Sequence, residues 1–391
     1  MKIPICGLFL SLAISSQAAL LITDHVDLTY RYVPATNTWQ TFFRHGGGFD
    51  NPNLETPLED AALPARDSLT TDGIRPGDRV VRNNNTAFNF IGAEIGTPYW
   101  NLPQSNRAYT WPGIRGSHPS GILLSYSNPD PRLNGLIRRW QAVQLLQVEY
   151  SGAAIDPPYF SVHTTSGFGV PTIWMANFDG INATDRYYLS DVSHNHMNWN
   201  FTELGIYRIT FRGSAFRASD SLPISSDPHT VTFAIGTLAT WRAAHFSGPQ
   251  IVDPAIGLPL ADPDGDSLLN LIEYAFNLDP TKPDAAPMAA DTGLSGLPLV
   301  KIEEINQTQR LTIEFIRRKA ASNPQIIYTA QVTNDLTAAT WTDWNTSGTS
   351  TITEVIGTDW ERVKLIDDQP VSNNAARFAR VKIALQPTIN Y

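Results

Sequence analysis

Residues 20–236 consist of short segments in which apolar and polar residues alternate, separated by clusters of Gly, Pro and Asn. Alternation with a period of two puts successive side chains on opposite faces of a strand, and the turn-forming clusters end each strand after a few residues. The clearest segments are residues 26–30, 143–150, 172–175, 206–211 and 230–235. The pattern predicts an all-β domain over residues 19–236, a β-sandwich of the Ig-like or jelly-roll-like kind. Charged residues make up only 17% of the chain, which suits a turn-rich β protein better than a helical bundle.

The sequence changes character after this domain. Residues 237–246, TLATWRAAHF, are typical of a short helix, and residues 261–280 predict a loop leading into a second helix that ends at Asp279-Pro280. After a polar stretch, strands are predicted at residues 297–302, 310–315, 326–332 and 378–383. We therefore expect a helical linker over residues 237–281, joining the first domain to a smaller β-sandwich over residues 282–391.

The first residues predict export. Lys2 precedes a short apolar run, and Ser16-Gln17-Ala18 resembles a signal-peptidase site, so residues 1–18 are predicted to be a signal peptide. Cleavage would remove Cys6, the only cysteine, and leave a mature chain without disulfides or thiolate metal ligands. No later segment reaches membrane-spanning length, so no transmembrane segment is expected after cleavage. We expect a secreted protein, or one held at the cell surface or outer envelope.

The charge of the chain excludes one class of partner. The formal net charge is −9, and no long Lys/Arg cluster occurs. Binding to nucleic acid needs a basic face that meets phosphates, so we expect no nucleic-acid partner.

An acidic loop precedes the second predicted helix. Its residues match positions 1, 3, 5, 7, 9 and 12 of an EF-hand-type loop, whose carboxylates and one backbone carbonyl surround Ca²⁺. The matching residues are Asp262, Asp264, Asp266, Leu268, Asn270 and Glu273. Ser267 stands at position 6, where glycine is usual. We predict a structural calcium site at the joint between the domains; the alternative is an acidic helix N-terminus in which Asp266 caps and the other acids face water.

Two pairs of residues suggest a transition-metal site. His194 and His196 are two apart on a predicted strand and share a face, as would Asn198, and His25 and Asp27 repeat this spacing. On two adjacent strands they would present three imidazoles and a fourth ligand, either Asp27 or Asn198, to one point. Zinc fits this set best, and copper, nickel or iron also accept imidazole. The alternative is that the histidines lie on the solvated face of a strand.

Three motifs in order support the metal hypothesis. They are Asp24-His25-Val26-Asp27, then Trp100-Asn101-Leu102-Pro103-Gln104 with Trp111-Pro112-Gly113, and then His194 through Tyr207. They resemble the GHVD, W-x-LPQ with WPG, and H-x-HANW-x-F-x-x-x-G-x-Y motifs of the bacterial surface-anchored protein domain known as the choice-of-anchor M family. Asp24 replaces a glycine and Met197 an alanine. The resemblance covers residues 20–213 and implies an exported surface module, found beside metal transport systems, in which His25, His194 and His196 act together in metal or substrate capture.

The C-terminal part resembles a second pattern. Residues 241–246 and 262–275 are similar to a calcium-loop and β-domain tail that is common in exported bacterial proteins. This resemblance implies secretion or surface display and no particular chemistry.

Other functions stay open from sequence alone. Trp100 and Trp111 could form an exposed platform for a carbohydrate or peptide, or could belong to the core. A metal-dependent hydrolase would need an open coordination position and a base such as Glu203 or Asp191. We expect a binding protein rather than an enzyme, with a metal ion or a small-molecule or glycan ligand, and an envelope transport component as a candidate partner.

Overall fold

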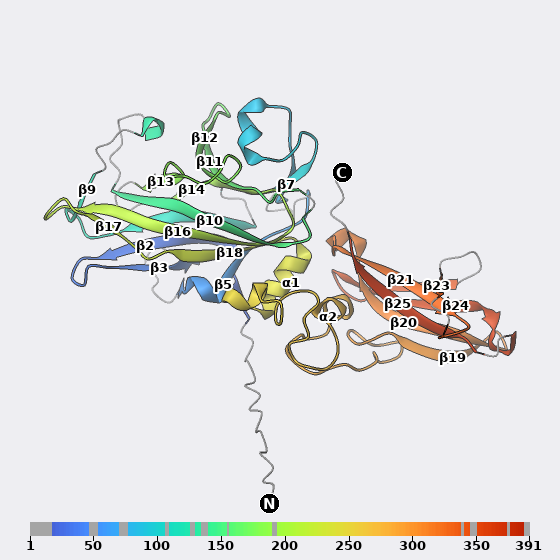
Figure 1. Cartoon of the computed structure of the whole chain (residues 1–391). Coiled ribbons are helices and arrows are strands. Elements are labelled where there is room, and N and C mark those ends of the chain that lie inside the picture. Colours follow the sequence, from blue (N-terminus) through green and yellow to red (C-terminus); the bar gives the residue numbers. More distant parts are fainter. Residues whose placement is uncertain are drawn as a thin grey trace, which may run out of the picture.

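The computed structural model describes residues 18–46, 54–69, 77–105, 109–125, 130–133, 140–154, 156–189, 194–337, 340–344, 350–373 and 376–386. Strands dominate these residues and the helices are short, so the predicted all-β class is confirmed (Figure 1). Apart from Ala18, the predicted signal peptide lies outside the described residues. Within them, no helix is both long and apolar enough to cross a membrane.

The N-terminal domain is built from three sheets. The largest has eight strands in the order β1-β5-β18-β16-β10-β13, with β9 and β17 also paired to β16. Its strands are β1 (Leu20–Leu21), β5 (Ala61–Ala65), β9 (Leu123–Leu124), β10 (Gln141–Gly152), β13 (Arg186–Leu189), β16 (Gly205–Arg217), β17 (Pro223–Ser225) and β18 (His229–Ile235).

The other two sheets have five strands each. One has the order β12-β11-β15-β7-β6 and the other the order β14-β8-β2-β3-β4. The first contains β6 (Arg79–Val81), β7 (Pro98–Leu102), β11 (Phe160–Thr165), β12 (Pro171–Ala176) and β15 (Asn198–Phe201). The second contains β2 (Asp24–Val33), β3 (Thr38–His45), β4 (Glu55–Thr56), β8 (Thr110–Ser117) and β14 (His194–His196).

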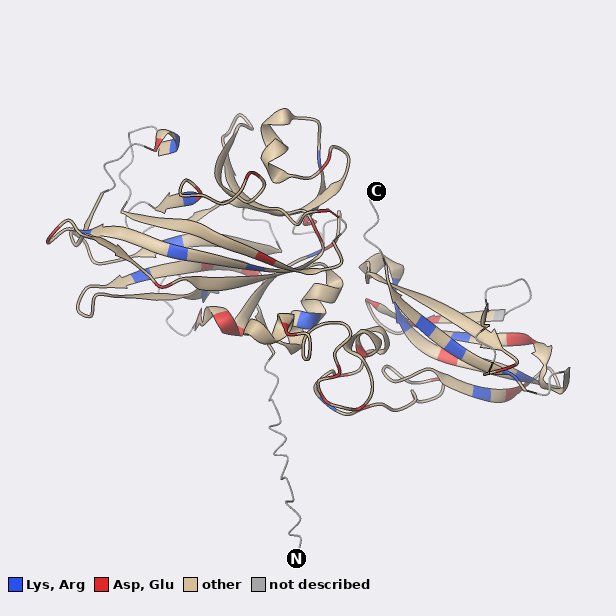
Figure 2. Ribbon diagram, viewed as in Figure 1, with Lys and Arg blue, Asp and Glu red and all other residues tan. Residues whose placement is uncertain are grey.

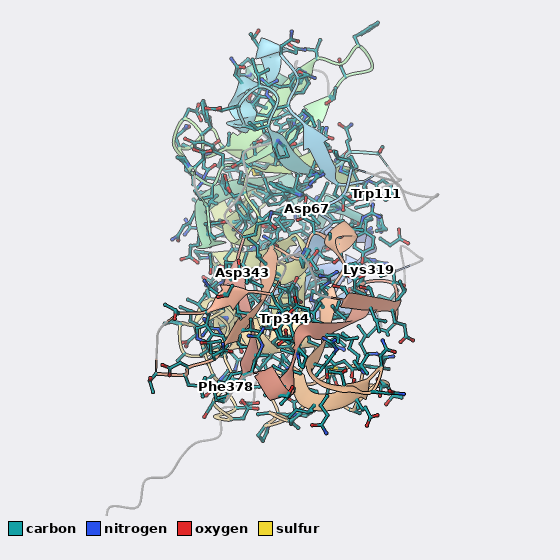
Figure 3. The ribbon with its side chains drawn as sticks, turned by 90° about the vertical axis from the view of Figure 1, so that its right-hand side faces the viewer. Asp67, Trp111, Lys319, Asp343, Trp344 and Phe378 are labelled. Carbon is teal, nitrogen blue, oxygen red and sulfur yellow. The ribbon has the colours of Figure 1, made fainter. Side chains whose placement is uncertain are left out.

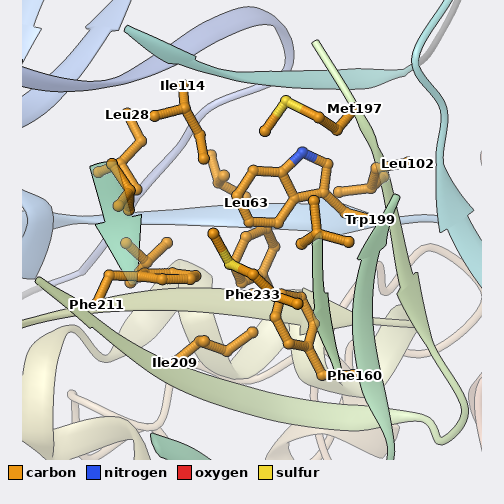
Figure 4. Packing of buried hydrophobic residues seen from close by; sticks show 14 of the residues in the cluster. Leu28, Leu63, Leu102, Ile114, Phe160, Met197, Trp199, Ile209, Phe211 and Phe233 are labelled. Carbon is orange, nitrogen blue, oxygen red and sulfur yellow. The ribbon is translucent and has the colours of Figure 1, made fainter. Parts of the chain in front are cut away.

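One hydrophobic core joins the three sheets. Figure 4 shows Ile114 of the β2 sheet, Trp199 of the β15 sheet and Phe233 of the eight-stranded sheet packed into the same cluster. Each is at most 1% exposed. The alternation of the sequence produces this arrangement, because every second residue of each strand turns inward. The two five-stranded sheets thus cover the eight-stranded sheet as the second layer of a sandwich.

A single residue separates two of these sheets. Strand β14 ends at His196 and pairs with β8, whereas β15 begins at Asn198 and pairs with β7. Between them Met197 is fully buried in the core. The chain therefore leaves one sheet for the other immediately after His196.

The C-terminal domain is a smaller sandwich, as predicted. A four-stranded sheet (β19-β20-β24-β23) packs on a three-stranded one (β22-β21-β25) around a second core. The strands are β19 (Leu299–Ile305), β20 (Thr308–Arg318), β21 (Ile326–Thr333), β22 (Thr342–Asp343), β23 (Ser350–Val355), β24 (Trp360–Pro370) and β25 (Phe378–Leu385). Basic and acidic residues alternate over its strands (Figure 2), and ion pairs such as Arg317–Glu361, at 2.6 Å, join them.

Two short helices lie between the domains: α1 (Thr237–His245) and α2 (Asn270–Phe276). The sequence predicted that α2 would continue to Asp279, but Asn277 adopts a left-handed conformation (φ 56°) and ends it. Polar contacts cross the boundary: Asn323 donates a hydrogen bond to Asp67, which lies near the C-terminal strands in Figure 3. The backbone carbonyl of Tyr274 in α2 accepts a hydrogen bond from Arg318 of β20, and Arg242 of α1 donates one to the Ser151 carbonyl of β10, so the helical segment is attached to both domains.

Candidate metal centre

The register of three strands brings the predicted histidines together. The sequence suggested that the two ligand pairs lie on adjacent strands. Instead, β8 lies between β2 and β14 and separates the two pairs. In one row across the sheet, Asp27, Gly113 and His196 lie side by side. In the rows on either side, Trp111 pairs with His25 and Arg115 pairs with His194.

The side chains converge on one point. One ligand atom each from His25, Asp27, His194 and His196 lies within 4.8 Å of all the others. The ring centroids of His25 and His196 are 5.0 Å apart, those of His194 and His196 are 5.3 Å apart, and those of His25 and His194 are 5.6 Å apart. Asp27 Oδ1 lies 3.7 Å from His25 Nε2 and 3.9 Å from His196 Nε2. These separations suit donors grouped around one ion, because zinc is bound at about 2 Å from each ligand.

Gly113 makes this approach possible. A Cβ atom at this position would lie 2.6 Å from Asp27 Oδ1 and 3.0 Å from His196 Cε1. Any side chain on β8 at Gly113 would therefore fill the space between the carboxylate and the imidazole. The WPG motif places this glycine directly after Trp111 and Pro112.

The carboxylate of Asp27 is the member of the cluster that most needs a partner. Asp27 is 1% exposed, and neither carboxylate oxygen has a hydrogen-bond partner among the described residues. Arg115 Nη1 is 3.8 Å from Oδ2, while Oδ1 is directed at the histidines. Burial raises the pKa of Asp27 to about 7, although Arg115 and Arg44 act in the opposite direction. A buried acid without hydrogen bonds is costly, and a bound cation would remove that cost.

The histidines are held in the form that binds metals. Burial, followed by the charge repulsion of the neighbouring imidazoles, lowers the pKa of His196 to about 3. Burial also lowers the pKa of His25 and His194. Neutral imidazole offers a nitrogen lone pair to a metal, so the arrangement suits coordination without first losing protons.

Trp111 and Asn198 take other positions than the sequence suggested. The ring of Trp111 stacks on His196 with centroids 3.7 Å apart, and its Nε1 donates to the carbonyl of Gln104. Asn198 is not a ligand in this geometry, because Oδ1 accepts from Gln104 N at 3.0 Å and Nδ2 donates to Thr165 Oγ1 at 3.2 Å. The shift between sheets at Met197 turns Asn198 away, which leaves Asp27 as the candidate for a fourth ligand.

The acidic loop forms a second cluster, beside α2 and between the domains (Figure 1). Ligand atoms of Asp262, Asp264 and Asp266 lie within 4.8 Å of one another, as do those of Asp266, Glu273 and Asp284. Glu273 is completely buried, and both of its carboxylate oxygens lack hydrogen-bond partners among the described residues. Burial, followed by the surrounding acids, raises the pKa of Glu273 to about 8.

The remaining loop residues fit the same centre. Asn270 is buried and donates to the carbonyls of Ile256 and Leu258, while its Oδ1 has no hydrogen-bond partner among the described residues. The carboxylate of Asp266 accepts a hydrogen bond from the backbone N of Leu268 and so holds the turn in shape. The Leu268 carbonyl, which is expected to bind calcium, belongs to this turn. Ser267 has φ 76°, the left-handed conformation for which the EF-hand loop uses glycine.

The sequence interpretation missed Asp284. It lies in the polar stretch after α2, eleven residues beyond Glu273, and no loop spacing includes it. The backbone N atoms of Asp284 and Ala285 donate to Asp266 Oδ2, at 3.1 and 3.0 Å, and so bring Asp284 to the cluster. An aspartate between turn-forming residues carries no signal of its own, so only the fold identifies it.

The structure removes two of the alternative site residues. Trp100 is 2% exposed and donates a hydrogen bond from Nε1 to Asp67, so it is a core residue and offers no platform for a sugar. Glu203 lines a cavity that includes none of the three histidines. Asp191, the other base considered, lies outside the described residues.

A cavity of about 460 Å³ lies where the two domains meet. Its walls are mostly apolar and include Leu238, Leu258 and Leu385, together with Asn323 and Gln325. None of the residues of either metal cluster lines it. The two candidate metal sites and this apolar cavity are thus separate features.

Comparison with known proteins adds no identification. No model of a known protein family matches the chain, and no curated protein matches it. The resemblance to the surface-anchored family therefore depends on its motifs alone. Asp24, where the motif has glycine, has φ 75°, a conformation that glycine adopts most readily.

Proposed function

We propose that the chain is an exported binding protein that holds a transition-metal ion, with zinc as the best fit, between His25, Asp27, His194 and His196. The observation that carries this proposal is the convergence of three imidazoles on a buried carboxylate that has no hydrogen-bond partner in the described parts of the chain. Three nitrogens and one oxygen complete a tetrahedral zinc site. A site with four protein ligands is closed, so it favours binding over catalysis.

Accessibility of the cluster supports capture of an ion from solution. The side chain of His25 is 31% exposed, whereas those of His196 and Asp27 are 8% and 1% exposed. An ion can therefore approach past His25 and come to rest against the buried ligands. The signal-peptide pattern and the motif resemblance favour a place at the cell surface or envelope, with a metal transport component as partner.

We assign the acidic loop a supporting role. Calcium bound by Asp262, Asp264, Asp266, Leu268, Asn270, Glu273 and Asp284 would neutralise the buried Glu273 and stiffen the segment between the domains. Carboxylate and carbonyl oxygens are the ligands that calcium prefers, and the loop offers no imidazole. The two clusters should therefore hold different ions.

Elemental analysis of the purified mature protein tests the proposal. We expect about one equivalent of zinc or another transition metal, lost in the His194→Ala/His196→Ala double variant, with calcium retained. His245→Ala is the matched control, because this half-buried histidine lies in α1, outside the cluster. If wild-type protein binds no transition metal after reloading, the proposal is wrong.

A further inference from the structure

A second cavity of about 230 Å³ lies in the N-terminal domain, next to the turn between β15 and β16. Its acidic lining residues are Glu94, Asp156 and Glu203, and its aromatic ones are Trp100, Tyr159 and Phe178. No Lys, Arg or His is among its lining residues. Glu94, Asp156 and Phe178 are exposed at the rim.

Glu203 is the most buried of the three acids that line this cavity. It is 5% exposed, and its Oε2 has no hydrogen-bond partner among the described residues. The turn holds it in place, because its backbone N donates to Tyr207 Oη at 3.0 Å. Burial, with a contribution from Asp156, raises the pKa of Glu203 to about 7. A buried carboxyl oxygen with no partner, beside further acids, calls for a positively charged or hydrogen-bond-donating ligand.

The spacing of the acids argues against a metal ion. None of these three acids belongs to a described group of three or more His, Asp or Glu whose ligand atoms lie within 4.8 Å of one another. Carboxylates farther apart than this can still serve a ligand that spreads several N–H donors over a larger volume. The aromatic walls match such a ligand too: Tyr159 and Phe178 meet edge to face with ring centroids 5.0 Å apart.

We propose that this cavity binds a small organic cation, an alkylammonium or guanidinium group. Its charged end would donate hydrogen bonds to Glu203, with Asp156 and Glu94 adding attraction at the rim. Its alkyl part would lie against Tyr159 and Phe178, whose ring faces also attract cations. The group could belong to a free amine or to a lysine or arginine side chain.

Calorimetric titration of the full mature protein distinguishes these sources. The probes are 1,5-diaminopentane, Nα-acetyl-lysine methylamide and Nα-acetyl-arginine methylamide, with pentanol and methyl β-glucoside as neutral comparisons. We expect at least one cationic probe to bind with a dissociation constant on the order of 1 mM or tighter. The preferred probe identifies a free amine or a side chain as the source.

Variants test the role of the acids. Glu203→Gln keeps the shape of the side chain and should weaken binding by about tenfold or more, because a charge-assisted hydrogen bond is lost. Asp156→Asn, at an exposed position, should weaken binding about threefold. Glu304→Gln, on the surface of the C-terminal domain, is the control. The proposal is overturned if no cationic probe binds, if a neutral probe binds equally well, or if both cavity variants bind like wild type.

Discussion

The two candidate metal sites are built in opposite ways. The acidic loop takes six of its seven proposed ligands from twelve consecutive residues, Asp262 to Glu273. The histidine cluster joins residues separated by about 170 positions, and depends on a third strand that contributes no ligand. The first site is made by a local turn, and the second by sheet register.

This difference has chemical consequences. The loop contains oxygen ligands alone and surrounds a completely buried Glu273, whereas the sheet site has three imidazoles and one carboxylate. Oxygen ligands suit calcium, and imidazole suits zinc and its neighbours. Adding one ion at a time to metal-stripped protein should therefore fill the sites separately.

The largest effect is expected from calcium. At a concentration about a thousand times its dissociation constant, calcium should raise the free energy of unfolding of stripped protein by about 4 kcal/mol. In Glu273→Gln this stabilisation should largely vanish, because the buried bidentate ligand is lost, and in Asp284→Asn it should shrink. Thermal unfolding with and without calcium measures it. Equal stabilisation of wild type and Glu273→Gln would show that the loop is only an acidic helix N-terminus.

The next effect tests sheet register. Gly113→Ala should lower zinc affinity by about 10- to 100-fold, since its Cβ would enter the space between Asp27 and His196. Calcium affinity should not change. Gly167→Ala is the control, because a Cβ there meets nothing within 4 Å. Zinc titration of Gly113→Ala with wild-type affinity would contradict the assigned geometry.

A buried histidine outside the cluster shows how burial alone changes the pKa of an imidazole and the stability of the protein. His163 is 4% exposed, Asn200 donates to its Nδ1, and burial lowers its pKa from 6.5 to about 4. As the pH falls, His163 is therefore protonated in the unfolded chain before it is protonated in the folded protein. This favours unfolding, so stability is lost between pH 6.5 and about 4.

His163→Asn keeps the hydrogen-bond acceptor and removes the titration. Between pH 7 and pH 4.5, stripped wild type should lose on the order of 2 kcal/mol more stability than this variant. Urea unfolding at the two pH values measures the difference. Parallel losses in both proteins would mean that His163 is protonated in the folded state.

The smallest effect concerns backbone conformation in the loop. Ser267 holds φ 76°, so Ser267→Gly should stabilise the calcium-loaded protein by about 1 kcal/mol. Ser267→Ala should show no gain, because it keeps the Cβ atom. A gain in both variants would trace the effect to the hydroxyl instead. Asp24→Gly offers the equivalent test beside the histidine cluster, where φ is 75°.

Strand positions were predictable wherever alternation was clear. The segment 206–211 lies inside β16, and 326–332 inside β21, because period-two burial is recorded in the residues themselves. Strands β23 and β24 were missed by the sequence interpretation. The end of α2 was misplaced because the left-handed Asn277 stops the helix before the proline signal.

The sequence by itself determined the all-β class, the acidic loop and the three histidines as candidate ligands, because alternation and loop spacing are local properties. Only the tertiary structure decided that Asp27 and not Asn198 faces those histidines, and that Gly113 lies between Asp27 and His196. It also decided that Asp284 joins the acidic loop. Those outcomes depend on which strands pair and in which register. Pairing is settled by burial of a core shared by three sheets, and no short stretch of sequence contains that information.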